Sequence, residues 1–468
     1  MNCIAILDIG KTNKKLFLID EHYRIVWERG ESFPETIDED GDACEDVILL
    51  TDWVKKSLKE LTQLPGFTVK ALNFSTYGAS LVYLDDQGQV AAPLYNYLKP
   101  YPGTLQQQFQ DSYGSLSWET ASPALGSLNA GLQLYRLKYL QPALYARVRY
   151  ALHLPQYISY LVTGRPLADI TSVGCHTMLW DFTTQDYHYW VKKEGLTDKL
   201  PPFFPCNETM RTTLPGNETI GTTLSGNETM GTALPNNETI NTADYQVGAG
   251  LHDSSAALIP YLTSFSAPFV LISTGTWCIT LNPFNKQPLT AAELEQDCLC
   301  YLTYEGNPVK AARIFAGNEH EQQVRRLAEY YQTPVNYYQQ VAFDPAIFAL
   351  LHPADISRFA DRSLNDFASY EIAYHRLMMD IMEQQKHSTE LVTTGTPVKR
   401  IFVDGGFGRN PVYMHLLAAA FPDMEVYAAS VAQATAIGAA LAIHQRWNPQ
   451  PLPGDLVEMR LYTHNKTI

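Results

Sequence analysis

Two short hairpins, one in each half of the chain, carry residues that could hold a phosphate group. Residues 4–19 read as an apolar strand with Asp8 near its end, a turn at Gly10, and a second apolar strand. Residues 269–281 repeat this plan around Gly275. The backbone N–H groups of such turns can bind phosphate oxygens, and a neighbouring carboxylate can face a cation. A tight hairpin also forms without any ligand, but two copies indicate two similar lobes that close on one nucleotide.

A third element adds a glycine-rich turn. An apolar strand over residues 400–405 leads into Gly406, and the spacing predicts a helix over 412–421. Asn410 is the expected N-cap of this helix and Pro411 its first residue. Because glycine has no side chain, the backbone at this turn can approach a flat ligand closely.

Residues 247–257 place Asp253 at the junction between a strand and a helix. A carboxylate within reach of a hydroxyl group can accept its proton during phosphate transfer. An aspartate at the start of a helix is also an ordinary N-cap. The residues alone therefore leave both roles of Asp253 open.

Strand and helix patterns alternate in both halves, which favours an α/β architecture. The patterns predict helices over 52–61, 131–140 and 156–162, a buried strand over 69–74, and its return strand over 81–84. At 468 residues the chain is too long for one ordinary core, so two domains are expected.

In this order and spacing, the two hairpins and the glycine turn resemble the FGGY carbohydrate kinase family. Residues 247–257 resemble the segment that carries the catalytic aspartate of that family, and residues 74–80 resemble its sugar-contact motif. The motifs look closest to the rhamnulokinase and fuculokinase branches. Residues 433–440 also resemble a family element, although close helix packing alone would explain their small side chains.

The resemblance implies an α/β fold with two actin-like (ribonuclease H-like) domains that flank a catalytic cleft. The expected N-terminal domain covers residues 1–262 and the C-terminal domain residues 263–468. The implied activity is an ATP-dependent carbohydrate kinase that moves the γ-phosphate of Mg-ATP to a hydroxyl of a sugar. The expected substrate is a ketose similar to rhamnulose, fuculose or xylulose, and the implied cofactors are ATP and Mg²⁺.

The resemblance also assigns roles to single residues. Asp253 is the expected base, and Asp8 the expected ligand of Mg²⁺, with a hairpin acid that only accepts turn amides as the alternative for Asp8. The nucleotide and its phosphates are assigned to Gly10, Thr12, Asn13, Lys15, Gly275, Thr276, Gly405, Gly406 and Asn410. Lys14 is the alternative to Lys15 as the lysine that faces phosphate. The sugar is assigned to Thr76, Tyr77, Gly78, His252 and Asp253.

Two positions depart from the family pattern. The kinases closest in motif have Trp where this chain has Tyr77, and Asp where it has Ser80. A serine cannot replace the charge-assisted hydrogen bonds of an acid, so the substrate need not be rhamnulose or fuculose. A tyrosine on a strand is otherwise usually a core residue. The departures motivate a second hypothesis, an actin-like ATP-binding switch or regulatory protein without sugar phosphorylation.

Residues 207–242 contain a ten-residue tandem repeat in which Asn-Glu-Thr recurs four times. A partner-binding or oligomerisation arm is one interpretation, and it gives a third hypothesis, a repeat-mediated interaction protein. A neutral expansion of a surface loop is the other, because longer loops add little closure entropy.

The amino-acid composition limits the classes of binding partner that are expected. A net charge of −15 argues against nucleic acid or an anionic membrane, since either would need a basic surface. No signal peptide and no run of membrane-spanning length is apparent. Seven cysteines with scattered spacing indicate reduced thiols and a cytoplasmic location, and Cys298 and Cys300 are expected to be buried thiols rather than zinc ligands. The expected partner is a small-molecule sugar, and the sequence leaves open whether two copies of the chain form a homodimer.

Overall fold

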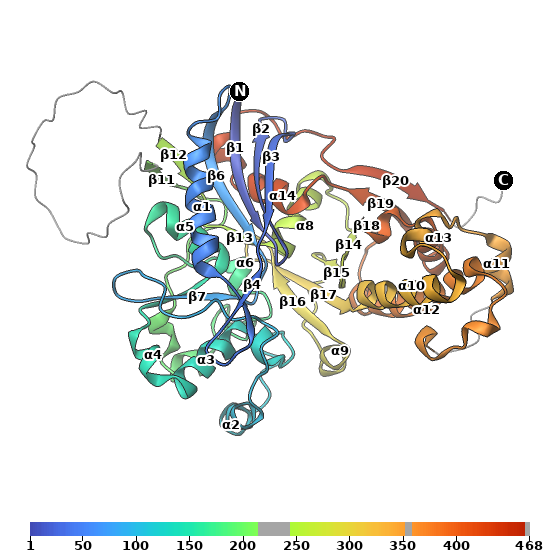
Figure 1. The fold of residues 1–468 in the computed structure, drawn as a ribbon, viewed down its shortest axis with the longest axis horizontal. Helices are drawn as coiled ribbons and strands as arrows, with labels where there is room; N and C mark the ends of the chain where they lie inside the picture. Colours follow the sequence, from blue (N-terminus) through green and yellow to red (C-terminus); the bar gives the residue numbers. More distant parts are fainter. Residues whose placement is uncertain (214–243, 352–357, 464–468) are drawn as a thin grey trace, which may run out of the picture.

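The computed structural model describes residues 1–213, 244–351 and 358–463. In these residues the chain forms two seven-stranded mixed sheets, one from each half (Figure 1). The first sheet has the order β11-β12-β6-β1-β2-β3, with β13 beside β6, and the second has the order β16-β17-β15-β14-β18-β19-β20. The predicted repeat falls mainly on residues 214–243, outside the described residues.

The strands of the first sheet are β1 (Asn2–Ile9), β2 (Asn13–Asp20), β3 (Ile25–Ser32), β6 (Thr68–Thr76), β11 (Met210–Thr213), β12 (Asp244–Val247) and β13 (Leu251–His252). Those of the second are β14 (Val270–Thr274), β15 (Cys278–Asn282), β16 (Cys298–Leu302), β17 (Pro308–Ile314), β18 (Arg400–Gly405), β19 (Glu425–Ser430) and β20 (Glu458–Tyr462). Three short pairs complete the strands: β4 (Glu35–Ile37) with β5 (Ala43–Glu45), β7 (Leu81–Leu84) with β8 (Tyr150–His153), and β9 (Trp180–Asp181) with β10 (Asp186–Tyr187).

The helices on the N-terminal side are α1 (Val47–Leu61), α2 (Gly103–Tyr113), α3 (Ala130–Leu140), α4 (Pro142–Arg147), α5 (Leu154–Thr163), α6 (Ile170–Val173), α7 (Tyr189–Lys193) and α8 (Asp253–Ser264). Those that follow are α9 (Ala291–Glu295), α10 (Ala316–Tyr331), α11 (Pro345–Leu350), α12 (Tyr370–Thr393), α13 (Pro411–Ala420), α14 (Ala434–Ala442) and α15 (His444–Trp447).

The two sheets repeat one arrangement. In the first, β1 pairs antiparallel with β2 and parallel with β6. In the second, β14 pairs antiparallel with β15 and parallel with β18. Each half therefore presents a hairpin beside a parallel strand, as the two similar sequence motifs predicted, and the α/β class is confirmed.

Strand β1 is apolar from Cys3 to Leu7 because both of its faces are covered there. Ile4 and Ile6 face a core cluster that contains residues of α8 and α14. The alternate residues Ala5 and Leu7 face a second cluster with α1 and α5. A strand buried on both sides reads as a continuous hydrophobic run, which is what residues 3–7 show before Asp8.

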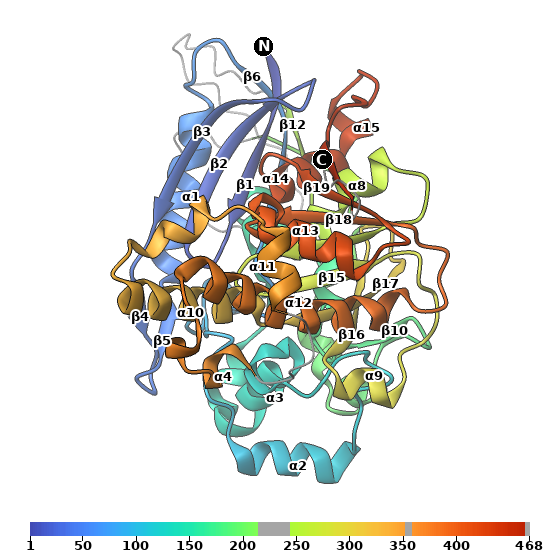
Figure 2. The ribbon, with the colours of Figure 1, turned by 90° about the vertical axis from the view of Figure 1, so that its right-hand side faces the viewer.

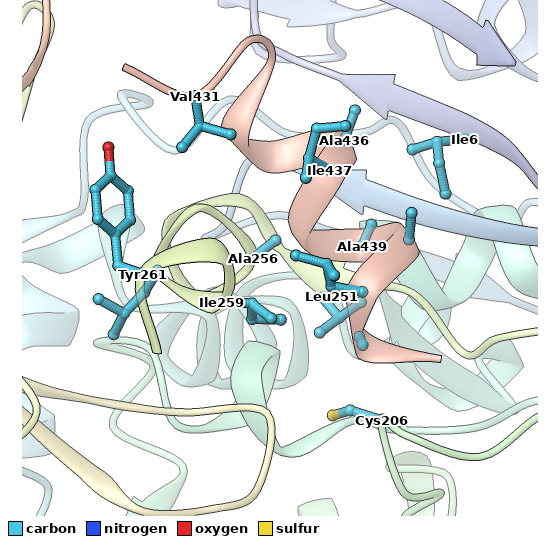
Figure 3. Close-up of a cluster of buried hydrophobic side chains, with 14 of the residues drawn as sticks. Ile6, Cys206, Leu251, Ala256, Ile259, Tyr261, Val431, Ala436, Ile437 and Ala439 are labelled. Carbon is cyan, nitrogen blue, oxygen red and sulfur yellow. The ribbon is translucent and has the colours of Figure 1, made fainter. Parts of the chain in front are cut away.

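Helix α14 comes from the C-terminal half but lies on the first sheet, where it contacts β1 and β6 (Figure 2). Its partner is α8, and side chains of both helices meet in one core cluster with Ile6 and Leu251 (Figure 3). The predicted domain boundary at residues 262–263 falls inside α8, and it stays a prediction.

Most predicted elements occur close to their expected bounds. Helix α1 begins five residues before the expected residue 52, because Asp46 caps it by accepting the N–H groups of Ile48 and Leu49 at 3.0 and 2.9 Å. The pairing predicted for residues 81–84 is wrong, since β7 pairs with β8 and not with β6. Ala79 has a positive φ of 56°, which turns the chain away from β6 before β7 begins.

Two observations in the described residues concern the cysteines and the helices. All seven cysteines lie in this part of the chain, and each is a buried, free thiol, as expected for Cys298 and Cys300. Among the described helices, none combines the length and the apolar character that a membrane span requires.

The contact between α8 and α14 has no room for a side chain at Gly438, whose added Cβ would lie 1.8 Å from the carbonyl oxygen of Ala256. We expect Gly438→Ala to destabilise the protein by about 3 kcal/mol, since a buried backbone atom must move. Denaturant unfolding measures this. Gly454→Ala is the control, because an added Cβ there meets nothing within 4 Å. Equal stability of the two variants would contradict the close helix contact.

Candidate active site

Asp8 and Asp253 lie at the same edge of the first sheet. Ser75 of β6 is the register partner of Asp8 on one side and of Leu251 on the other. All three strands run parallel, so their carboxyl ends meet at one edge, and Asp253 follows two residues after Leu251. With strands about 4.8 Å apart, the two carboxylates lie on either side of β6 at neighbouring levels.

Asp8 is held by a contact from the C-terminal half. The hydroxyl of Thr435, at the start of α14, donates a hydrogen bond to Oδ2 of Asp8 at 2.7 Å. Burial raises the pKa of Asp8 to about 6, the Thr435 hydrogen bond opposes this, and the charge of Asp253 adds to it. Two carboxylates that repel each other in a half-buried place favour a bound cation.

Strand β2 directs its two lysines to opposite faces. Lys15 is the register partner of Asp8, and its Nζ lies 3.5 Å from Oε1 of Gln433. Lys14, on the opposite face of the strand, is 1% exposed and forms an ion pair with Glu45. Of the two lysines predicted to face phosphate, only Lys15 is on the face of Asp8.

The turn between these strands leaves its predicted ligands accessible. Thr12 and Asn13 are exposed, and the hydroxyl of Ser32 donates to Oδ1 of Asn13 at 2.8 Å. The N–H of Gly10 donates to the carbonyl of Asn13 at 2.9 Å, which closes the turn. The hydroxyl of Thr12 and the amide of Asn13 are therefore placed at the surface of the turn, next to Asp8.

Helix α8 begins at Asp253, and its N-cap is His252, so Asp253 occupies the first helical position rather than the cap. Oδ1 of Asp253 accepts the N–H of Ser254 at 2.6 Å and lies 3.2 Å from Nε2 of His252. These contacts fix the carboxylate while its side chain remains 33% exposed.

His252 is 4% exposed and packs directly against the backbone of Gly78. A Cβ at residue 78 would lie 2.7 Å from the imidazole, so glycine is required there. The ring of Tyr301, from the second sheet, stacks on His252 at 5.9 Å with an interplanar angle of 15°. Sγ of Cys175 lies 3.4 Å from Nε2 of His252, and Nδ1 of His252 has no hydrogen-bond partner among the described residues.

Thr76 and Tyr77, predicted to contact the sugar, are both buried. The hydroxyl of Thr76 donates to the carbonyl of Tyr77 at 3.0 Å. The phenol of Tyr77 is turned toward Glu45 and donates to its carboxylate. Burial, together with this carboxylate, raises the pKa of Tyr77 well above its usual value.

The second hairpin meets α10 without space between them. A Cβ at Gly317 would lie 1.8 Å from the carbonyl oxygen of Gly275, and the N–H of Asn318 donates to the carbonyl of Thr276 at 3.1 Å. Gly275 and Thr276 are both exposed at the turn. The close backbone contact ties the turn to the first residues of α10.

The glycine turn after β18 also rests on the second hairpin. Gly405 has φ of 92°, and the hydroxyl of Thr274 donates to the carbonyl of Asp404 at 2.6 Å and accepts the N–H of Phe407 at 3.0 Å. Asn410 caps α13, as predicted, by accepting the N–H of Val412 at 3.0 Å. Its Nδ2 donates to the hydroxyl of Tyr374 at 2.7 Å.

A cavity of about 860 Å³ opens between these elements in the C-terminal half. It is lined by Thr274, Gly275, Thr276, Gly317, His320, Glu321, Val324, Arg325, Val335, Tyr338, Gln339, Gly406, Phe407, Arg409, Asn410 and Pro411. The structure thus brings together four predicted nucleotide residues, Gly275, Thr276, Gly406 and Asn410. Gly405 lies outside this lining, in a neighbouring cavity of about 490 Å³ that Gln433 also lines.

Several lining residues were missed by sequence reasoning. Residues 317–321 had no assignment, although a glycine followed by polar residues at a helix start was a visible signal. Nε2 of His320 lies 3.0 Å from the hydroxyl of Tyr374. Burial lowers the pKa of His320 to about 4, so the imidazole is neutral at pH 7. Tyr301 and Cys175 lacked any signal because their strand and loop meet His252 only in three dimensions.

One cluster of three carboxylates in the described residues could suggest a metal site elsewhere: Asp38, Asp40 and Asp42. The ammonium group of Lys99 lies 2.6, 2.9 and 2.6 Å from their oxygens. Lys99 therefore already supplies the positive charge that this cluster requires.

Two family models match the C-terminal half. The "FGGY family of carbohydrate kinases, C-terminal domain" matches residues 371–444, and "Carbohydrate kinase FGGY, C-terminal domain" matches residues 266–350. These two matches support membership of the FGGY family of carbohydrate kinases. The hairpin of Gly275 and the strands and helices around the cavity are the parts of the chain that the models recognise.

Curated relatives and solved structures agree with this. Rhamnulokinases from Mannheimia succiniciproducens and Halalkalibacterium halodurans are each 24% identical to this chain, over 39% and 37% of its length. The matches span only 40% and 37% of those relatives. A carbohydrate kinase from Novosphingobium aromaticivorans has a TM-score of 0.76 at 24% identity, covering 98% of this chain and 94% of that one. A xylulose kinase from Rhodospirillum rubrum has 0.79 at 16%, covering 99% and 94%. These structures establish the fold, two actin-like domains.

The raised pKa of Asp8 predicts an unusual stability profile. Because the pKa is about 6 in the folded state and 3.8 ordinarily, the native protein binds more protons between pH 4 and 6, and stability falls as the pH rises through this range. Asp8→Asn does not titrate, so we expect it to be more stable than the native protein by about 3 kcal/mol at pH 7 and equally stable below pH 4.

Thermal unfolding at pH 4 and pH 7 tests this. Asp423→Asn, at an exposed site, is the control, and we expect it to leave the thermal stability unchanged at both pH values. Loss of stability of Asp8→Asn at pH 7 would contradict the burial of a repelled charge at this position.

Proposed function

We propose that this protein transfers the γ-phosphate of Mg-ATP to a hydroxyl of a ketose. The observation that carries the proposal is the pair Asp8 and Asp253, placed on either side of β6 at one sheet edge. A kinase of this type needs a carboxylate for the cation and another for the proton of the hydroxyl, and both must face the same small volume.

Asp253 is the proposed base. Its Oδ1 is anchored by the N–H of Ser254 and lies near Nε2 of His252, so the carboxylate is oriented before the sugar binds. As the sugar oxygen bonds to phosphorus, its proton passes to this carboxylate, and the bond from phosphorus to the ADP oxygen breaks. The partly exposed side chain gives the sugar hydroxyl access to Asp253.

The residues present fit a magnesium ion and a nucleotide. Asp8 is one carboxylate in a place where the charge of Asp253 disfavours its ionised form, and Mg²⁺ typically binds one or two carboxylates together with phosphate oxygens. When bound, the ion would neutralise charge on the phosphates. Lys15 would add a positive charge on the same face, and the exposed Thr12 and Asn13 could donate to phosphate oxygens.

The nucleotide end is proposed for the cavity of the C-terminal half. Its size is within the range of small-molecule sites, and it joins the Gly275 turn to the Gly406 turn. The neutral imidazole of His320 and the apolar ring of Phe407 suit a flat, uncharged ring better than a charged group. Both turns leave backbone groups accessible near the phosphate end.

The sugar is proposed to bind beside His252 and Gly78. Nε2 of His252 faces the partly exposed carboxylate of Asp253, which is the group in this place that a sugar hydroxyl can reach. The similar proteins include rhamnulokinases and a xylulose kinase, and this similarity supports a ketose as the substrate of this protein.

The free, buried thiols support a reducing, cytoplasmic compartment.

Release of ADP from Mg-ATP against a panel of ketoses, aldoses and polyols tests the proposal. We expect one sugar to stimulate release, and Asp253→Asn to lower kcat by about 10²–10⁴-fold, because the variant keeps the shape but cannot accept the proton. The exposed Asp423→Asn is the matched control and should retain full turnover. If ATP binds but no sugar stimulates release, the protein is an actin-like nucleotide switch rather than a kinase.

A further inference from the structure

A buried ion pair lies directly beneath the first hairpin. Lys14 of β2 and Glu45 at the end of β5 are 1% and 4% exposed, and their charged groups are in contact. Nζ of Lys14 also donates to the carbonyl of Lys11 at 3.0 Å, within the turn of the hairpin. The pair therefore connects the turn that carries Thr12 to strand β5, which is not part of the sheet.

Tyr77 extends this connection to the proposed sugar segment. Its hydroxyl donates to the second carboxylate oxygen of Glu45, and its side chain is buried at 7% exposure. Its backbone N–H donates to the carbonyl of Ile9 at 3.1 Å, at the end of β1. Tyr77 is thus attached to the hairpin twice, once through the backbone and once through Glu45 and Lys14.

Stability alone does not account for a charged pair in this place. Removing two charges from water costs several kcal/mol each, and well-packed apolar side chains of similar size are often as stable or more stable. An ion pair does, however, fix direction and distance, which apolar contacts do not. The three side chains join the two segments whose relative position a phosphoryl transfer would require.

We propose that Lys14, Glu45 and Tyr77 form a positioning network that holds the sugar segment, Thr76–Gly78, at a fixed place against the first hairpin. The inference rests on the proposed function of these segments. Tyr77 then acts through its hydroxyl and not by stacking on the sugar, and Lys14 acts beneath the turn and not on phosphate. Lys15, on the opposite face, remains the lysine for phosphate.

The chemistry makes such a network useful. Gly78 supports the imidazole of His252, which lies beside Asp253, so a shift of the segment moves the proposed base region relative to Asp8. A displacement of about 1 Å at reacting groups can cost 10²-fold in rate.

Tyr77→Phe is the most selective variant, because it removes one hydroxyl and keeps the ring. The matched control is Tyr157→Phe, which removes a buried hydroxyl that bonds Thr51 at 2.6 Å in another part of the first half. Backbone hydrogen exchange, measured without substrates, is the first readout. We expect at least tenfold faster exchange at the amides of Gly10 and Tyr77 in Tyr77→Phe and in Glu45→Gln, and less than twofold change there in Tyr157→Phe.

Kinetics are the second readout. We expect Tyr77→Phe to lower kcat/KM for the sugar at least tenfold while the KM for ATP changes less than threefold. Tyr77→Phe combined with Glu45→Gln should lose little more than the worse single variant, since the residues act as one unit. The double variant Lys14→Met/Glu45→Leu replaces the charges by apolar groups, and we expect it to remain folded and still to lose sugar turnover.

Three results would overturn the network. The first is an unchanged rate of amide hydrogen exchange at Gly10 and Tyr77 in the folded Tyr77→Phe variant. This result would contradict the network even if the native protein phosphorylates no sugar. Another is faster exchange combined with native kinetics. The third is full sugar turnover by Lys14→Met/Glu45→Leu. Failure of the proposed kinase function is recognised separately, by the native protein showing no sugar-stimulated ADP release.

Discussion

The contact between α8 and α14 is the constraint on which the candidate site depends. Helix α8 starts with Asp253, and α14 starts beside Thr435, which holds Asp8. Because Gly438 has no side chain, α14 can approach the backbone of α8 at Ala256. The positions of both carboxylates therefore follow from one helix contact. The first residues of both helices lie near Asp8, and the partial positive charge of a helix N-terminus generally favours an anion.

The side chain of Asn73, in β6, adds two hydrogen bonds next to the contact between α8 and α14. It is fully buried, its Nδ2 donates to the carbonyl of Ala439 at 2.8 Å, and its Oδ1 accepts the N–H of Gly250 at 3.1 Å. One side chain thereby joins α14 to the segment that leads into Asp253. A buried amide with partners on both sides specifies a single arrangement more strongly than an apolar residue of similar size.

Local signals explain which features were predictable from sequence. The two hairpins and the Asn410 cap are encoded within a few neighbouring residues, as is the end of α5 at Gly164. The pairing of β7 was not predictable, because it depends on the backbone of Ala79 and on a partner seventy residues away. The contacts of Lys14 and Tyr77 with Glu45 were not predictable for the same reason, since Glu45, their common partner, carries no motif. The assigned roles of Asp8 and Asp253 stay predictions, although the fold places these residues together.

The placement of α14 also bears on how the chain folds during synthesis. Ile4 and Ile6 of the first strand are covered by Ala436, Ile437 and their neighbours, more than four hundred residues later. A ribosome that has made only the first half has thus released a sheet with one apolar face only partly covered, by residues of α8. Until the last residues of α14 emerge, that face is exposed to aggregation or to a chaperone, and the N-terminal half cannot complete its core as an independent unit.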